Sequence, residues 1–418
     1  MRTLYTLLLT LFTPLIVLRL WWKGRVQPAY RQRIGERFGR VPAHPVAVWV
    51  HAVSVGESLA ALPLIEALIA RHGERRVWVT TTTPTGSERV QAALGTRVMH
   101  SYAPYDLPWI VSRFLQRVQP RQVVVMETEL WPNLFSALRA SGIPLTIANA
   151  CLSPRSFKGY SRVAGFAREV LSNVTTVAAQ SALDAERFRA LGAPDVQVVG
   201  NLKFDLALPT EPHPLTATIA RLWNADRATW VAVSTHEGEE EVVLDAHHRL
   251  LQHDAYALLI LVPRHPQRFD DVAARIRAKG MACVRRSALP ENPDFSGQRH
   301  PTPVLLGDSM GEVMAYLAAA QVAFVGGSLV PVGGHNVLEP AALGRPVIFG
   351  PHMHNFLAAR ELLLGVEAAL EVRDAAELDE TVQALLRDAD RRQRMGEAGR
   401  AAVAANRGAL QRLLALLA

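Results

Sequence analysis

Two successive sets of short, strongly apolar runs dominate the sequence from residue 46 onward, and helix-period segments fill the gaps between them. The first set lies at residues 46–53, 77–81, 122–126, 145–148, 176–179 and 196–199. The second set lies at residues 230–233, 258–262, 281–284, 304–306, 323–325 and 347–349. Strands this apolar are buried on both faces, and helical crossovers between them make the sheets parallel. The sequence therefore predicts an α/β fold of two doubly wound domains.

A proline-rich stretch separates the two sets. Residues 206–214 read LALPTEPHP, and three prolines in so short a segment are typical of a semi-rigid linker. We therefore expect a first domain at residues 23–207 and a second at residues 208–418. Ligands of open parallel sheets bind at the carboxyl ends of the strands, so we expect a cleft there, although the fold alone does not define the reaction.

The first segment of the chain, residues 1–22, has a different character. Residues 3–22 read TLYTLLLTLFTPLIVLRLWW, which is just long enough for a helix to cross a bilayer. The basic residues that follow it are Lys23, Arg25, Arg31, Arg33, Arg37 and Arg40. This cluster favours a cytoplasmic location for the rest of the chain and attracts anionic lipid headgroups. We expect a membrane anchor that either spans the bilayer or lies on it.

A cleaved signal peptide is the alternative for this segment. It is disfavoured because no small-residue cleavage site follows the apolar run and because the positive charge lies on its far side. The basic cluster also explains part of the net charge of +7, which comes from 45 Lys and Arg against 38 Asp and Glu. Nucleic acid is therefore not a leading partner.

Several familiar motifs are missing from the sequence. No G-x-G-x-x-G follows the first strand and no P-loop motif occurs, which disfavours dinucleotide and P-loop folds. Cys151 and Cys283 cannot form a disulfide framework. His247, His248 and His253 fall on one expected helix and are interpreted as a solvated face, and the D-x-D match at residues 388–390 as chance. A metal-dependent nucleotide-sugar site is therefore not supported.

The strongest local signal for binding is the glycine-rich segment at residues 325–340, VGGSLVPVGGHNVLEP. Paired glycines allow the backbone to approach a phosphate, and a helix that opens near His335 or Asn336 adds free N–H groups. Glu339 would lie in the first turn and accept from ribose hydroxyls. The alternative is a glycine-rich turn with an Asn cap, in which Glu339 only favours the helix dipole.

Further strand ends carry residues that suit a nucleotide. Arg264, in the segment after residues 258–262, offers a planar fork for phosphate, and residues 310–312 could pack against a base. In the first half, Glu57 follows a strand and opens a helix, where it is either a dipole-favouring cap or a general base. Candidate residues for contacting a second substrate are Glu127, Glu129, Arg155 and Lys203.

Taken together and in this order, these motifs resemble the Kdo transferases (3-deoxy-D-manno-octulosonic acid transferases) of Gram-negative lipopolysaccharide assembly. The matching pieces are HAVSVGE at 51–57, TTTPTG at 81–86, ETELWPN at 127–133, GNLKFD at 200–205, PRHP at 263–266, GDSMGE at 307–312 and GGHNVLEP at 333–340. The resemblance implies a GT-B glycosyltransferase with an N-terminal membrane-anchor helix, on the cytoplasmic face of the inner membrane. It implies inverting transfer of Kdo from CMP-Kdo to a lipid A precursor similar to lipid IVA, with release of CMP.

The resemblance also implies roles for individual residues. Glu57 matches the catalytic base. Our own assignment of Glu127, Glu129, Arg155 and Lys203 to the acceptor side stands beside the resemblance and is not implied by it. The residues that match the CMP-binding motifs are Pro263, Arg264, Met310, Gly311, Glu312, Asn336, Val337, Leu338 and Glu339. We expect no metal and no cofactor besides the donor substrate, and partners limited to CMP-Kdo, the lipid acceptor and anionic membrane lipids. The alternatives are a GT-B nucleotide-sugar epimerase, which needs no lipid acceptor, and a non-catalytic membrane-surface protein.

Overall fold

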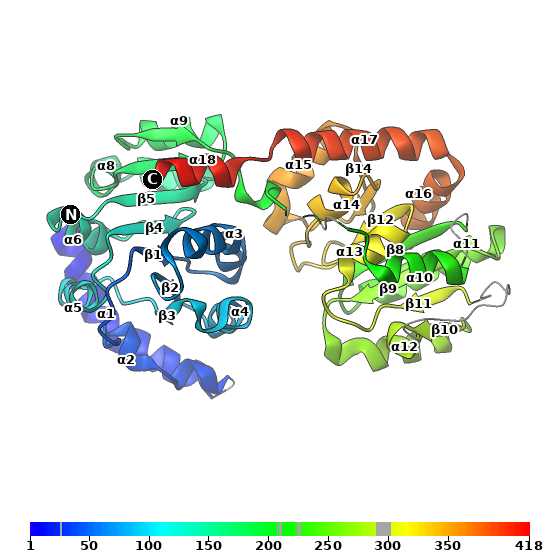
Figure 1. Ribbon diagram of the computed structural model, residues 1–418, viewed down its shortest axis with the longest axis horizontal. Helices are drawn as coiled ribbons and strands as arrows, with labels where there is room; N and C mark the ends of the chain where they lie inside the picture. Colours follow the sequence, from blue (N-terminus) through cyan, green and yellow to red (C-terminus); the bar gives the residue numbers. More distant parts are fainter. Residues whose placement is uncertain (26, 207, 209–210, 224–226, 290–301) are drawn as a thin grey trace. The chain divides into compact units, whose positions relative to one another are not determined.

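The computed structural model describes residues 1–25, 27–206, 208, 211–223, 227–289 and 302–418 (Figure 1). It consists of two compact units, one formed by Met1–Asp205 with Asn406–Ala418 and the other by Leu206–Ala405. The expected boundary at residues 207 and 208 is therefore close to the observed one, but residues 406–418 belong to the first unit and not to the second. Part of the expected linker, residues 207 and 209–210, lies outside the described residues.

The first unit contains a parallel sheet of seven strands in the order β3-β2-β1-β4-β5-β6-β7. Its strands are β1 (Val48–His51), β2 (Val77–Thr81), β3 (Met99–Tyr102), β4 (Gln122–Met126), β5 (Leu145–Ala150), β6 (Thr176–Ala179) and β7 (Val196–Val198). The six predicted strands are confirmed. The seventh, β3, was not predicted because its sequence MHSY lacks a β-branched apolar run.

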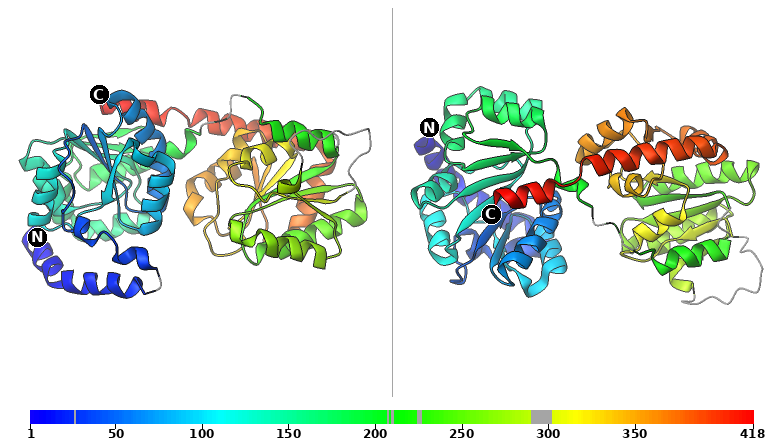
Figure 2. Two further views of the ribbon diagram at one scale, coloured as in Figure 1. Left: turned by 60° about the horizontal axis from the view of Figure 1, so that its bottom comes forward. Right: turned by 45° about the horizontal axis from the view of Figure 1, so that its top comes forward.

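Helices cover both faces of this sheet (Figure 2). They are α1 (Arg2–Lys23), α2 (Ile34–Arg37), α3 (Val55–His72), α4 (Pro84–Leu94), α5 (Pro108–Val118), α6 (Pro132–Ala140), α7 (Pro154–Ser161), α8 (Ala164–Leu171), α9 (Ala182–Ala190) and α18 (Ala409–Leu416), with 3-10 turns η1 (Pro28–Arg31), η2 (Gly95–Arg97) and η3 (Leu202–Phe204). Most of the helices that follow strands begin with a proline or with a Ser or Thr cap, as in α4, where Thr83 accepts from the Gly86 backbone N–H.

The second unit repeats the arrangement with the strand order β10-β11-β9-β8-β12-β13-β14. Its strands are β8 (Thr229–Thr235), β9 (Leu258–Pro263), β10 (Cys283–Arg285), β11 (Val304–Leu306), β12 (Val322–Val325), β13 (Val347–Phe349) and β14 (Ala369–Glu371). Its helices are α10 (Pro214–Trp223), α11 (Glu239–His253), α12 (Phe269–Ala278), α13 (Val313–Ala319), α14 (Leu338–Ala342), α15 (Leu357–Gly365), α16 (Ala375–Arg387) and α17 (Ala389–Ala405), with 3-10 turns η4 (Pro266–Arg268), η5 (Arg286–Ala288) and η6 (His354–Phe356).

The structure corrects two interpretations of the second half. The strand expected at residues 281–284 lies at Cys283–Arg285, and β14 was not predicted. His247 is not solvated: it is fully buried on α11, where its Nδ1 accepts from Trp230 Nε1 at 3.1 Å and its Nε2 lies 3.0 Å from the Pro303 carbonyl oxygen. The D-x-D match, which we interpreted as chance in a helical tail, lies at the start of α17, where Asp388 Oδ1 accepts from the Arg391 backbone N–H.

Candidate active site

Glu57 lies in the first turn of α3, where the sequence SVGE builds a variant of the capping box in which the Glu57 carboxylate accepts from the residue before the N-cap. The Ser54 hydroxyl accepts from the Glu57 backbone N–H at 3.1 Å, and Glu57 Oε2 accepts from the Val53 backbone N–H at 2.6 Å. Because β1 ends shortly before, the box fixes this carboxylate at the carboxyl edge of the first sheet. The capping role expected as the alternative is therefore present, and it coexists with a position suited to chemistry.

The surroundings of Glu57 raise the pKa of its carboxylate to near neutral pH. Glu57 is 7% exposed, and this burial raises its pKa to about 7. The hydrogen bond from Val53 opposes the rise, while the negative charges of Glu127 and Glu129 add to it. A carboxylate with a pKa near the working pH can take up a proton from a hydroxyl group and release it again.

Glu127, Glu129 and Lys203 belong to the same edge of the sheet. Burial raises the pKa of Glu127, the Lys203 charge opposes this, and the Glu129 charge adds to it. Glu127 follows β4 directly and has a φ of 57°, a backbone conformation that costs energy for a residue with a side chain. Glu129 Oε2 accepts from Trp131 Nε1 at 3.0 Å. The structure thus groups Glu57 with three of the four expected acceptor-side residues, whereas Arg155 lies exposed in the first turn of α7.

Lys203 is positioned by an amide network that the sequence did not reveal. Asn149 Oδ1 accepts from the Leu202 backbone N–H at 2.9 Å, and the Asn149 carbonyl oxygen accepts from Gln180 Nε2 at 2.9 Å. Gln180 Oε1 in turn accepts from Asn201 Nδ2 at 2.9 Å. Polar residues at the ends of β5 and β6 were the signal that could have revealed this network, because β5 lies next to β4 in the sheet and β6 lies next to β5.

In the second unit, the glycine-rich segment is held by a buried carboxylate. Glu239, the first residue of α11, is fully buried and accepts from the backbone N–H groups of Gly327, Ser328 and Leu329 at 2.6, 2.9 and 2.9 Å. It also accepts from the His236 backbone N–H at 2.9 Å. These bonds join two segments about 90 residues apart, which is why no local pattern pointed to Glu239.

The second glycine pair leads into a turn and not directly into a helix. Helix α14 starts at Leu338, later than expected, and it has only five residues. Asn336 Oδ1 accepts from the Leu338 backbone N–H at 3.1 Å, and Asn336 Nδ2 donates to Glu339 Oε1 at 3.0 Å. Val337 and Leu338 are buried, so at these two expected donor-site positions only the backbone is available to a ligand.

Arg264 and Glu339 come together at this edge of the second sheet. Burial raises the pKa of Glu339, while its hydrogen bond with Asn336 and the positive charge of Arg264 oppose the rise. Arg264 follows Pro263, the last residue of β9, and its backbone N–H donates to the Thr235 carbonyl oxygen at 3.0 Å. A guanidinium and a carboxylate side by side suit a phosphate and a sugar hydroxyl, respectively.

Three histidines to which the sequence analysis gave no binding role lie beside Arg264. His236 Nε2 and His335 Nε2 are 2.7 Å apart, and the His265 ring meets the His236 ring edge-on with centroids 5.2 Å apart. Burial, together with the smaller effects of the His236, Arg264 and His265 charges, lowers the pKa of His335 to about 4. Burial also lowers the pKa of His236, so the pair shares a hydrogen bond between neutral rings at neutral pH.

The remaining donor-site candidates, residues 310–312, lie between β11 and α13. Gly311 has a φ of +83°, and Met310 is 56% exposed, so its side chain is available to pack against a flat ligand. Glu312 is engaged by the Arg286 guanidinium, with two hydrogen bonds of 3.1 and 3.0 Å. Its side chain therefore holds the loop in place. Pro263 and Arg264 lie at the end of β9, and Asn336 and Glu339 lie at the start of α14.

Two seven-stranded parallel sheets, each with polar residues at its carboxyl edge, define an α/β architecture of the GT-B type. A solved structure with this fold is the UDP-GlcNAc 2-epimerase from Neisseria meningitidis bound to UDP-GlcNAc. It is 13% identical in sequence, with a TM-score of 0.56 and coverage of 89% of this chain and 99% of that chain. At this identity the likeness shows the fold alone.

Sequence comparisons identify the family. The family model of 3-deoxy-D-manno-octulosonic-acid transferase (Kdo transferase) matches residues 32–206. The chain is 43% identical to the 3-deoxy-D-manno-octulosonic acid transferase of Haemophilus influenzae, over 100% of this chain and 98% of that protein. It is 40% identical to that of Bordetella pertussis, over 99% and 98%. The chain therefore belongs to the Kdo transferase family, glycosyltransferases of lipopolysaccharide biosynthesis, and this confirms the resemblance.

Proposed function

We propose that the protein transfers Kdo from CMP-Kdo to a hydroxyl group of a lipid A precursor, with inversion at the anomeric carbon and release of CMP. The observation that carries this proposal is the position of Glu57, a buried carboxylate with a pKa of about 7 at the carboxyl edge of the first sheet. Inverting transfer needs a base on the acceptor hydroxyl, and Glu57 takes that proton while the donor phosphate departs.

The donor half of the reaction is assigned to the second unit. CMP leaves as a phosphate monoester, so negative charge develops on its oxygens as the bond to Kdo breaks. Arg264 stabilises that charge, whereas the backbone N–H groups of residues 327–329 are already taken by Glu239. The proposal includes no metal or other cofactor. Glu339, next to Arg264, accepts from ribose hydroxyls, and the exposed Met310 side chain packs against the base.

The acceptor half is assigned to the first unit. Lys203 lies close to the Glu127 carboxylate, where a cation can pair with a phosphate or a carboxylate of the acceptor. Helix α1 fits a membrane anchor, and the basic residues after it favour the cytoplasmic face of the inner membrane and its anionic lipids. This location matches an acceptor that is itself a membrane lipid, and nucleic acid is not among the proposed partners.

The test is Glu57→Gln, which keeps the size and the hydrogen bond with Val53 but removes the base. We expect CMP-Kdo binding to persist and transfer to fall by about 10²- to 10⁴-fold. The measurement is mass spectrometry of the product from CMP-Kdo and a tetraacylated lipid A precursor, which also counts the sugars added. Glu66→Gln is the matched control, because Glu66 lies on the same helix and is exposed in an ion pair with Arg97.

Near-normal transfer by Glu57→Gln would remove Glu57 from the role of base. The epimerase alternative predicts turnover of a nucleotide sugar without any lipid acceptor, and it is not favoured, because the relatives at 40–43% identity are transferases. A protein that only binds membranes predicts no turnover in either variant or in the unchanged chain.

A further inference from the structure

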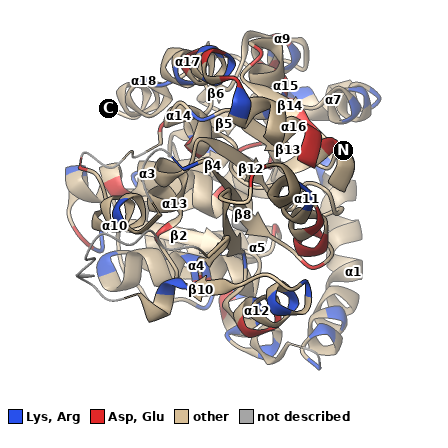
Figure 3. Ribbon diagram, turned by 90° about the vertical axis from the view of Figure 1, so that its right-hand side faces the viewer, with Lys and Arg blue, Asp and Glu red and all other residues tan. Residues whose placement is uncertain are grey.

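Helix α1 has two opposite faces that differ in their surroundings. One face carries a row of side chains at alternating spacings of four and three residues, all of them 47–70% exposed: Leu4, Leu8, Leu11, Leu15, Leu18 and Trp22. The opposite face is half-buried and contains Tyr5, Leu9, Thr13, Ile16 and Leu20. In Figure 3 most of α1 is uncharged, as its sequence requires. A helix with this division packs one side on protein and presents the other to an apolar medium.

The start of α1 is attached to the first unit by polar contacts. The Thr6 hydroxyl donates to Asn133 Oδ1 at 3.0 Å, and the Tyr5 hydroxyl donates to the Asp106 carboxylate. Asp106 and Asn133 are both buried, and the Tyr5 ring lies against the Phe166 ring with centroids 6.4 Å apart. We call Tyr5, Thr6, Asp106 and Asn133 the α1 joint.

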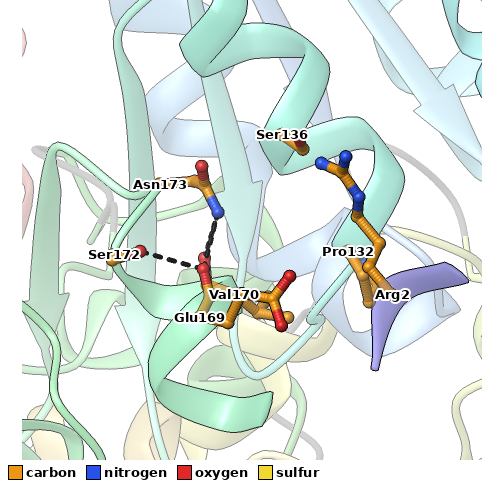
Figure 4. Close-up of a pocket in the computed structure, with 7 residues that line it drawn as sticks. All are labelled: Arg2, Pro132, Ser136, Glu169, Val170, Ser172 and Asn173. Atoms are coloured by element: carbon orange, nitrogen blue, oxygen red, sulfur yellow. Dashed lines mark hydrogen bonds between the residues drawn. The ribbon is translucent and has the colours of Figure 1, made fainter. Parts of the chain in front are cut away.

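A polar hollow of about 200 Å³ opens beside the start of the helix. Its lining includes Arg2, Ser136, Glu169 and Asn173, and Figure 4 shows the Arg2 side chain directed toward Ser136. The N-terminal ammonium lies 4.0 Å from Glu169. These charged and polar groups at the first residues belong in water or among headgroups and not inside a bilayer.

The other end of α1 is also attached to the first unit. Arg31, in the 3-10 turn η1, donates from Nε to the Trp21 carbonyl oxygen at 2.9 Å, and its guanidinium lies 4.4 Å from the centroid of the Trp21 ring. Lys23 lies 5.4 Å from the centroid of the Tyr30 ring. The helix is thus held near both of its ends by residues of the same unit.

These contacts decide between a spanning helix and one that lies on the membrane. An α-helix rises about 1.5 Å per residue, so Tyr5 and Trp22 lie roughly 25 Å apart along the axis. That distance approaches the hydrocarbon thickness of a bilayer, about 30 Å. If α1 crossed the membrane, Tyr5 and Thr6 would reach the side opposite the catalytic units and leave Asp106 and Asn133 without these partners.

We propose that α1 lies in the plane of the membrane surface, held to the first unit by the α1 joint, with its exposed leucine face in the lipid. The cations at its C-terminal end, Arg19, Lys23 and Arg25, are then placed among anionic headgroups. Burial raises the pKa of Asp106 to about 6, and the hydrogen bonds from Asn133, Leu134 and Tyr5 oppose this rise, so the carboxylate needs these donors.

The α1 joint also links the anchor to the acceptor half-site, a consequence that rests on the proposed function. Asp106 accepts from the backbone N–H groups of Asn133 and Leu134 at 3.0 and 2.7 Å and so caps the start of α6. Asn133 ends the ETELWPN segment that begins with Glu127 and Glu129. Seating α1 in the membrane therefore fixes the segment that carries the acceptor-side carboxylates.

The topology is tested without any measurement of activity, so its failure is separate from failure of the proposed function. Arg2→Cys is made in a chain in which Cys151 and Cys283 are replaced by Ser, and a membrane-impermeant maleimide is applied to spheroplasts and to inverted inner-membrane vesicles. We expect Arg2→Cys to be protected in spheroplasts and to react in inverted vesicles or only after denaturation, with Arg40→Cys as the control on the catalytic side. Reaction in intact spheroplasts would overturn the proposal.

The link to the acceptor site is tested with Thr6→Val. We expect this variant, in membrane-reconstituted full-length enzyme, to raise the KM for the lipid acceptor several-fold and to leave the KM for CMP-Kdo unchanged. Thr10→Val is the matched control, because Thr10 lies one turn further along, is exposed, and donates only within α1 to the Thr6 carbonyl oxygen among the contacts of the described residues. Equal effects of the two variants, or equal changes in both KM values, would overturn the link.

Discussion

Glu57 combines a structural and a chemical role in one carboxylate. One of its oxygens closes the capping box of α3 with the Val53 N–H, which fixes the position of the group. The cost of burying it, increased by Glu127 and Glu129, keeps its pKa near 7 instead of the usual acidic range. A base that is both fixed in place and easily protonated is what proton transfer from a sugar hydroxyl requires.

This balance predicts a pH dependence. Glu57 accepts a proton only when ionised, so kcat/KM should fall as the pH decreases below about 7 and level off above it. The measurement is the transfer rate at low acceptor concentration between pH 5.5 and 9, in buffers of constant ionic strength. Glu127→Gln removes one of the negative charges that raise this pKa, so the acidic limb should move to lower pH in that variant. An acidic limb that does not move would show that another group controls it.

At the residue scale, the sequence is informative where the determining partners are close in the chain. Ser54 and Glu57 are three residues apart, and the strand that ends just before them was enough to place Glu57 at a helix start. Glu239 and the pair His236–His335 depend on contacts across about 90 and 99 residues, respectively. No pattern within one segment contains that information.

Among the elements, the glycine-rich segment depends on α11 for its shape. Glu239→Ala removes a buried acceptor and leaves four backbone N–H groups without it. Two of these bonds, from Gly327 and Ser328, are buried. Each buried donor left unpaired costs about 1–3 kcal/mol, so we expect the second unit to lose at least about 2 kcal/mol and donor binding to weaken. Chemical denaturation of the full chain measures the loss of stability, and hydrogen exchange at residues 326–329 shows whether the glycine-rich segment loosens.

Glu241→Ala is the control for Glu239→Ala, because Glu241 lies on the same helix and is 58% exposed in its ion pair with Arg275. Removing such a surface pair costs little, roughly 0–1 kcal/mol. A similar loss of stability in the two variants would show that the hydrogen bonds from the glycine-rich segment are not what Glu239 contributes.

At Gly326 the glycine-rich segment packs directly against the backbone at the end of β8. A Cβ at Gly326 would lie 2.7 Å from the Ser234 carbonyl oxygen and 2.7 Å from the Thr235 Cα, and neither backbone atom can move without disturbing the end of β8. Gly326→Ala should therefore destabilise the second unit by about 1–3 kcal/mol and reduce donor binding. Gly365→Ala, where a Cβ meets nothing within 4 Å, should be neutral or stabilising. Thermal unfolding of the two variants compares them, and equal melting temperatures would contradict the argument.

The elements themselves were largely predictable, and the errors have physical reasons. Apolar β-branched runs gave the central strands, because those strands are buried on both faces by helices. The edge strands β3, β10 and β14 are only partly buried, so their sequences are more polar and were missed or displaced. Helix α14 starts later than expected because Asn336 caps it through a turn, a geometry that the spacing of glycines does not specify.

At the scale of the whole molecule, the sequence predicted two units but misplaced the end of the chain. The Ala- and Leu-rich pattern of residues 406–418 predicts an amphipathic helix that fits either core equally well. Asp205, the last residue of the first unit before the crossing, decides the matter by accepting from the backbone N–H groups of Gly408 and Leu410 at 2.6 and 2.5 Å. Asp205 and the segment 406–418 are therefore hydrogen-bonded to each other within the first unit, at the two places where the chain leaves that unit and returns to it.

This arrangement predicts that a destabilising substitution in residues 406–418 lowers the stability of the first unit and not of the second. Leu413, on α18, is fully buried in the same cluster as Leu64 and Leu68 of α3, although it follows the whole second unit in sequence. Leu413→Ala should cost about 2–5 kcal/mol and speed hydrogen exchange in β1 and β2, while the second unit keeps its protection. Leu385→Ala is the matched variant, because Leu385 is equally buried but lies in the core of the second unit. It should speed hydrogen exchange in the second unit and leave β1 and β2 protected. If Leu413→Ala loosened β8 and β9 instead, residues 406–418 would belong to the second unit, as the sequence alone led us to expect.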